Sequence, residues 1–193
     1  INYWTKKWGK DFPFYWVQLA NYMDAVEVPS ESLWAQVREA QTQTLSLSHT
    51  GQAVIIDIGE AKDIHPKNKQ EVGRRLALHA LHNDYGFSDV VCESPMPKTV
   101  RRVQDKIVVQ FDNVADGLIV KNKYGYLMSF AVAGNDGVYK WVQAKVVGKD
   151  RVVLSCPDVI DPVSVRYAWG DNPDDANLYN SVGLPATPFE IKI

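Results

Sequence analysis

The amino-acid sequence predicts an α/β layered region followed by an all-β sandwich, and two patterns support this prediction. Up to about residue 95, short apolar runs that suit strands alternate with stretches that suit amphipathic helices, which is typical of folds with parallel strands. From Lys106 onward apolar residues recur with a period of two, and turn residues separate the short runs. We therefore place a boundary near residues 95–104 and expect one domain over 1–97 and a second over 104–193.

The first strand and helix are expected between residues 14 and 40. Residues 14–20 form an aromatic, mostly apolar run that suits a buried strand. Ser30 follows Pro29 and is a candidate helix cap. The apolar face expected for the helix consists of Leu33, Trp34, Val37 and Ala40.

A second strand and helix follow. Residues 53–58 are rich in β-branched side chains and form the clearest buried strand of the chain. Pro66 suits the first turn of the next helix, and Gly86 suits its end. The apolar stripe expected for this helix consists of Val72, Leu76, Ala80 and Leu81.

The second half of the chain contains short β runs at regular spacing. The runs cover residues 107–111, 118–120, 127–132, 138–147, 151–154 and 163–169. Turn signals rich in Gly, Asn and Asp separate them at 133–137, 148–150 and 170–173. This spacing predicts a β-sandwich.

Composition excludes several classes of protein. At 46% hydrophobic and 23% charged residues the chain is typical of a globular protein, and a net charge of -2 argues against a nucleic-acid partner. No apolar run approaches the roughly 18 residues that span a bilayer, so no membrane partner is expected. Cys92 and Cys156 could pair, but two buried free thiols are favoured. The chain opens at Ile1 with neither an initiator methionine nor a signal peptide, so we expect it to be part of a longer protein.

The loop after residues 53–58 carries the best candidates for chemistry. Reactive groups gather beyond the carboxyl ends of strands in open α/β sheets, and Asp63 and His65 occupy such a loop. Acyl transfer needs an imidazole that takes a proton from serine and a carboxylate that orients the imidazole. A single Asp-x-His also occurs often as a surface pair. The other histidines are weaker candidates, because His79 and His82 lie within the predicted helix and His49 precedes a turn.

Two further acids flank this pair. Asp57 and Glu60 are candidate substrate-binding residues, although an acid that caps a turn is the favoured alternative. A glycosidase pair chosen from Asp57, Glu60 and Asp63 ranks lower, because glycosidases usually take their two carboxylates from separate elements. No cluster of His and Cys suggests a metal site.

No serine stands in a nucleophile motif. Neither GxSxG nor GDS occurs, and none of the ten serines sits in a strand–Ser–helix elbow. Trp141, Tyr167 and Trp169 are candidate glycan contacts on the sandwich, with core packing as the favoured alternative.

Several segments together resemble the sialate O-acetylesterase family of the SGNH hydrolase superfamily. The most specific is AVIIDIGEAKDIHPKNKQEVGRRLALHAL, residues 53–81, which resembles the last conserved block of that family. WGKDFPFYWVQLANY resembles the strand before its long helix. FDNVADGLIV, FAVAGNDGVYKWVQAKVVGKDRVVLS and VRYAWGDNPDDANLYNSVGLPATPF resemble its β domain and closing segment. The resemblance covers nearly the whole chain.

The resemblance implies part of a flavodoxin-like α/β/α esterase core followed by a β-sandwich. It implies hydrolysis of acetyl esters on sugars, with His65 as general base and Asp63 as its orienting acid, and no metal or organic cofactor. The superfamily usually spaces these residues as Asp-x-x-His, whereas Lys62 stands at that position here, so a backbone carbonyl or another acid could orient the ring. The serine and oxyanion-hole residues would lie in upstream blocks outside this chain.

The resemblance also implies the partners. Acetylated sialic acid is the leading substrate, and acetylated xylan or another polysaccharide is the alternative. A non-catalytic glycan-binding or structural role is a further alternative. The N-terminal esterase segment or a second copy of the chain would complete the core, and the implied location is periplasmic or extracellular.

Overall fold

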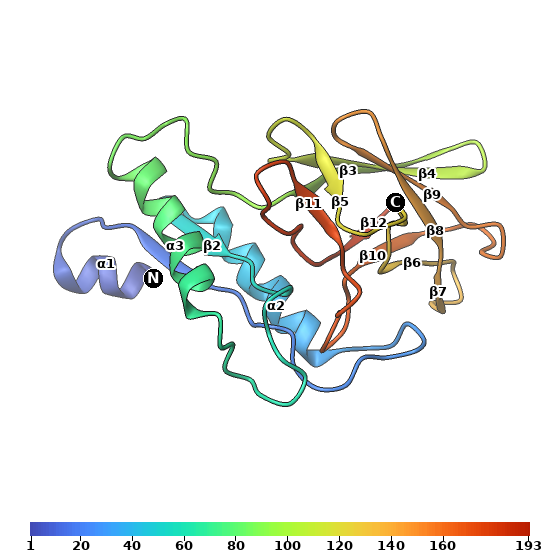
Figure 1. Cartoon of the computed structure of the whole chain (residues 1–193), viewed down its shortest axis with the longest axis horizontal. Helices are drawn as coiled ribbons and strands as arrows, with labels where there is room; N and C mark the ends of the chain where they lie inside the picture. The colour runs from blue at the N-terminus through green and yellow to red at the C-terminus, as the bar shows by residue number, and fades with distance from the viewer.

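The computed structural model describes residues 1–193 and has mixed α/β architecture (Figure 1). Three α-helices, one 3-10 helix and a two-stranded sheet form the first part of the chain. These elements are α1 (Asn2–Trp8), β1 (Phe14–Val17), α2 (Leu33–Gln43), the 3-10 helix η1 (Thr44–Ser46), β2 (Thr50–Ala53) and α3 (Lys69–Asn83). No helix is both long enough and apolar enough to cross a membrane.

Ten strands make up the rest of the chain, at the other end of the molecule in Figure 1. They are β3 (Met96–Val103), β4 (Lys106–Asp112), β5 (Leu118–Val120), β6 (Phe130–Ala133), β7 (Tyr139–Trp141), β8 (Gln143–Val147), β9 (Arg151–Ser155), β10 (Ser164–Tyr167), β11 (Leu178–Asn180) and β12 (Phe189–Lys192). The predicted run over 138–147 is divided at Val142, and strands β3, β11 and β12 were not expected from the sequence.

Strands β1 and β2 pair in parallel, as the alternation of strands and helices predicted. The pairing ends where Val17 faces Ala53, so β2 lies earlier than the predicted strand over 53–58. Val54, Ile55 and Ile56 are buried but unpaired. An apolar sequence indicates that a segment is buried, but it does not show whether the segment is paired in a sheet. Here the buried segment continues beyond the last residue that pairs with β1.

The helices bury different faces from those predicted. Ser32, not Ser30, caps α2 by accepting a hydrogen bond from the Ala35 amide. Leu33 is 78% exposed and Val37 is also exposed, whereas Ala35 and Arg38 are buried. The predicted apolar face of α2 is therefore wrong, because the buried side of this helix carries an arginine.

Helix α3 differs from its prediction in a similar way. Its cap is Asn68, whose side chain accepts from the Glu71 amide, so Pro66 precedes the helix instead of forming its first turn. The predicted stripe is only half-buried, and Arg75 and His79 are the buried residues. Gly86 adopts a φ of 78° shortly after the helix ends, in the left-handed region that glycine tolerates best.

The β-rich part consists mainly of two antiparallel four-stranded sheets. Their strand orders are β3-β4-β9-β8 and β12-β10-β6-β7, and β5 pairs with β11 in a separate two-stranded sheet. One hydrophobic core joins both larger sheets, and the rings of Phe111 on β4 and Phe189 on β12 lie 5.9 Å apart. This sheet-rich arrangement fits the predicted β-sandwich.

Strand β3 occupies the segment where the domain boundary was expected. It pairs with β4 along its length, with an irregularity between Pro97 and Thr99. Proline lacks an amide hydrogen, and an edge strand with a bulge accommodates it. The division into 1–97 and 104–193 stays a prediction, and β3 by its pairing lies with the β-rich part.

Cys92 and Cys156 are free and buried, as favoured from the sequence. Desolvation raises the pKa of the Cys92 thiol to about 11. Both cysteines therefore lack the low-pKa, accessible thiolate that marks a reactive cysteine.

Candidate active site

Asp63 and His65 lie together in the loop that follows β2. Oδ1 of Asp63 accepts a hydrogen bond of 2.9 Å from the His65 amide and lies 3.3 Å from Nδ1 of the His65 ring. The His65 side chain is 81% exposed and the Asp63 side chain 46% exposed. The acid two residues before the histidine is therefore the group that contacts its ring.

This contact sets the electrostatics of the pair. The hydrogen bond from the His65 amide, followed by the contact with its ring, holds the pKa of Asp63 below its ordinary value. A charged carboxylate next to Nδ1 favours the tautomer in which Nδ1 carries the proton. Nε2, on the opposite side of the ring, is then free to accept a proton, and this is the arrangement that a general base requires.

Glu60 and Lys67 form an ion pair within the same loop. Lys67 Nζ donates to Glu60 Oε2 over 2.6 Å, and the Asp63 amide donates to the Glu60 carbonyl over 3.3 Å. The carboxylate of Glu60 thus has an ion-pair partner within the loop. Contact of Glu60 with a substrate stays a prediction.

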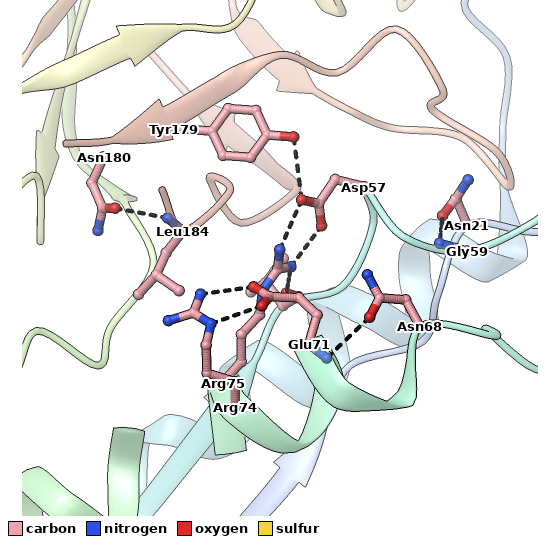
Figure 2. A network of polar contacts seen from close by, with 11 residues as sticks. Asn21, Asp57, Gly59, Asn68, Glu71, Arg74, Arg75, Tyr179, Asn180 and Leu184 are labelled. Carbon is pink, nitrogen blue, oxygen red and sulfur yellow. Dashed lines mark hydrogen bonds and ion pairs between the residues drawn. The ribbon is translucent and has the colours of Figure 1, made fainter. Parts of the chain in front are cut away.

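Asp57 belongs to a network that joins β2, α3 and β11 (Figure 2). Arg75 donates to both carboxylate oxygens of Asp57, at 2.6 and 2.9 Å. The Tyr179 hydroxyl donates to Oδ2 of Asp57 over 3.3 Å. Arg75 also donates to Glu71 and to the Val54 carbonyl. These partners give Asp57 a positioning role at the start of the loop, and its contact with a substrate stays a prediction.

A chain of hydrogen bonds through Gly59, Asn21 and Asn172 also holds the loop. The Gly59 amide donates to Asn21 Oδ1 over 2.7 Å, as Figure 2 shows, and Asn21 Nδ2 donates to Asn172 Oδ1 over 2.8 Å. Asn172 Nδ2 donates in turn to the Met23 carbonyl. A Cβ atom at position 59 would lie 2.3 Å from the backbone oxygen of Asn21, so only glycine fits. The β-rich part thus helps to place the loop.

Arg38 ties the two parts of the chain together. Its side chain is fully buried and donates to four carbonyls, those of Leu19, Ala20, Gly170 and Asp171. Desolvation lowers the pKa of Arg38 to about 10, so its guanidinium stays charged at neutral pH. The Arg38 guanidinium therefore binds carbonyl groups from both the segment after β1 and the segment after β10.

The remaining histidines have structural contacts. His79 is buried and its Nε2 lies 3.1 Å from the Gln52 carbonyl, whereas His82 contacts the Val90 carbonyl. His49 forms an exposed pair with Asp11 at 2.8 Å. No serine hydroxyl is within hydrogen-bond distance of the His65 ring, whose only polar contact is Asp63.

The residues that hold the loop were not predicted from the sequence. They are Asn21, Gly59, Asn172 and Tyr179, together with Arg38. Gly170-Asp171-Asn172-Pro173 was interpreted only as a turn. Nothing in that local sequence indicates that Asn172 binds Asn21, or that Gly170 binds Arg38, each more than 100 positions away.

Comparison with known proteins supports the resemblance found in the motifs. No protein-family model matches the chain. The chain is 28% identical to sialate O-acetylesterase from Mus musculus over 202 residues, which cover 94% of this chain and 36% of that protein. The Homo sapiens sialate O-acetylesterase is also 28% identical, over 197 residues.

One solved structure is similar over nearly the whole chain. The crystal structure of a carbohydrate acetylesterase from Xanthomonas citri matches with a TM-score of 0.90 and 43% identity, covering 98% of this chain and 44% of that one. The chain spans 36% of the length of the curated relatives. The predicted similarity to sialate O-acetylesterases is thus confirmed.

Proposed function

We propose that this chain supplies the general base and its orienting acid to a carbohydrate O-acetylesterase of the SGNH type. The observation that carries the proposal is the Asp63–His65 contact, which leaves Nε2 free in a loop after a parallel strand. The similarity to a carbohydrate acetylesterase and to sialate O-acetylesterases gives the reaction class. In this proposal the α/β part is a partial flavodoxin-like core.

The proposed reaction proceeds in two steps. A serine from a segment outside these 193 residues attacks the acetyl carbonyl while Nε2 of His65 takes the serine proton. The imidazolium then gives this proton to the sugar oxygen as the ester bond breaks. Water next attacks the acetyl-serine, and His65 takes the water proton and returns it to the serine, which releases acetate. Asp63 orients the ring and stabilises its charged form throughout.

The proposed substrate is an acetylated sugar or glycan. Acetylated sialic acid follows from the names of the curated relatives, and an acetylated polysaccharide is the alternative. The proposed location, periplasmic or extracellular, follows from the resemblance alone. None of the proposed steps routes a proton or a bond through a metal or an organic cofactor.

Substitution of His65 in an enzyme that contains both the serine segment and these residues tests the proposal. His65→Ala is expected to lower kcat for acetylated saccharides by about 10⁴-fold or more, because no other group takes the serine proton. The matched control is His49→Ala, since His49 is also an exposed histidine paired with an aspartate. Full activity in His65→Ala, or an equal loss in His49→Ala, would contradict the proposal.

The 193 residues alone are expected to hydrolyse p-nitrophenyl acetate at no more than the background rate. The reason is that His65 has no serine within reach. The assay compares this chain with its His65→Ala variant. Robust turnover that His65→Ala abolishes would mean that a nucleophile lies within these residues.

A further inference from the structure

We propose that a groove centred on Trp141 binds an extended, uncharged saccharide chain at a place separate from the Asp63–His65 pair. The inference rests on the proposed function only for the class of ligand. The site itself follows from the shape, aromatic surface and charge of the β-rich part.

The groove consists of two adjoining cavities of about 310 and 670 Å³. Leu127, Met128, Trp141 and Val142 line both of them. The first cavity lies between the 25–27 loop and the segment after β10, and the second extends over β8 and β9. Pockets of roughly 300–1,000 Å³ hold drug-sized ligands. The two cavities share a wall, so together they offer room for more than one sugar ring.

Trp141 is held in one orientation at the junction of the cavities. It lies on the edge strand β7, is 42% exposed, and donates from Nε1 to the Glu27 carbonyl over 2.9 Å. Figure 1 shows the loop before α2 reaching toward β7, in agreement with this contact. A ring that is fixed before a ligand arrives loses little freedom on binding. Its exposed face suits stacking on the apolar C–H face of a sugar ring.

Other side chains extend this aromatic and apolar surface. Tyr126 is 67% exposed and Met128 is 44% exposed, and both line the second cavity. Trp169 lines the first cavity and is 6% exposed, so it forms part of the cavity wall.

The charge of the first cavity favours a neutral ligand. Glu27, Asp174 and Asp175 line it, and no basic side chain does. Carboxylates accept hydrogen bonds from sugar hydroxyl groups but repel another carboxylate, such as that of sialic acid. Lys106 and Lys145 lie only in the second cavity. The first cavity therefore fits an uncharged part of a saccharide better than an anionic sugar.

The three aromatic residues that the sequence offered as glycan contacts lie in different surroundings. Tyr167 is fully buried and accepts the Leu178 amide through its hydroxyl oxygen, so it packs in the core and cannot touch a glycan. Trp141 and Trp169 both line the groove, Trp141 with an exposed face and Trp169 as part of its wall.

Calorimetry on the 193-residue chain tests the proposal with xylohexaose and cellohexaose as neutral probes and sialyllactose as the anionic probe. At least one hexasaccharide is expected to bind more tightly than sialyllactose. Trp141→Ala is expected to raise its Kd by about tenfold, equivalent to about 1.4 kcal/mol. Tyr126→Ala, which alters only an exposed side chain, is expected to raise the Kd as well. Asp174→Asn is expected to bring sialyllactose closer to the neutral probes.

Trp8→Ala is the matched control, because Trp8 is 60% exposed on α1 and lies outside the groove. Its Kd is expected to stay unchanged, and thermal unfolding checks that each variant is folded. The proposal is overturned if neither hexasaccharide binds, if sialyllactose binds more tightly, or if Trp141→Ala and Tyr126→Ala leave the Kd unchanged. Binding is measured without turnover, so its failure is distinct from a failure of the His65 test.

Discussion

At the scale of single residues, the site depends on one contact and on the space around one glycine. Asp63 contacts the ring that the proposal makes the base, and its own carboxylate stays charged because the His65 amide donates to it. Gly59 lets the loop pass against Asn21. Both features position polar groups, the Asp63 carboxylate against His65 and the Gly59 amide against Asn21. Neither adds buried apolar surface.

We expect Asp63→Asn to lower kcat of the complete esterase by about 10²–10⁴-fold, because an amide neither holds the Nδ1–H tautomer nor stabilises the imidazolium. Asp63→Glu should recover part of this loss. Asp11→Asn is the matched control, since Asp11 pairs with His49 at the surface. Steady-state kinetics check the result, and an unaffected kcat in Asp63→Asn would assign the orienting role to another group.

Gly59→Ala is expected to destabilise the fold by about 1–3 kcal/mol, because the added Cβ meets the backbone of Asn21. Gly73→Ala is the control, since nothing lies within 4 Å of a Cβ at position 73 in α3. That change should stabilise the helix by about 0.5–1 kcal/mol. Urea unfolding measures both changes, and equal effects of the two would mean that the loop shifts freely.

At the scale of elements, buried arginines decide how the helices sit. Arg38 holds α2 against the end of β1 and the segment after β10, and Arg75 holds α3 against the end of β2. Each of these arginines can be buried because it donates four hydrogen bonds to carbonyl or carboxylate oxygens. The apolar residues of α2 and α3 alone predict that other faces of these helices are buried, not the faces that carry Arg38 and Arg75.

Arg38→Met is expected to destabilise the protein by about 3–5 kcal/mol, since four carbonyls lose their shared donor. Arg101→Met, at an exposed position of β3, should change stability by no more than about 0.5 kcal/mol. Urea denaturation compares the two. A loss below about 1 kcal/mol for Arg38→Met would mean that water replaces the guanidinium.

Glu71 gives α3 a pH dependence whose sign is defined. Hydrogen bonds from Arg74, then from Arg75, lower the pKa of Glu71 to about 2. A depressed pKa means that its stabilisation is present above the ordinary value near 4.5 and is lost as the pH falls toward 2. The difference in unfolding free energy between wild type and Glu71→Gln should therefore shrink over that range. A constant difference would contradict this assignment.

At the scale of the whole molecule, the α/β part has open surfaces. Its sheet has only two strands, and Leu33 and Val37 of α2 are exposed. Two-stranded sheets are marginal alone, and open edges invite pairing with another chain. We expect another polypeptide segment or a second copy of the chain to cover them. Light scattering on the isolated chain should show self-association, and a monodisperse monomer would count against this prediction.

The sequence by itself determined the alternation of strands and helices between residues 14 and 83, the change to a period of two, and the loop that holds Asp63 and His65. Those features follow from local periodicity and from motifs that span adjacent residues. Only the tertiary structure decided which helix faces are buried and what fixes the loop. Asn21 and Asn172 meet across 151 positions, and Arg38 reaches Gly170 across 132. Burial of a polar group depends on such distant partners, and apolar periodicity carries no information about them.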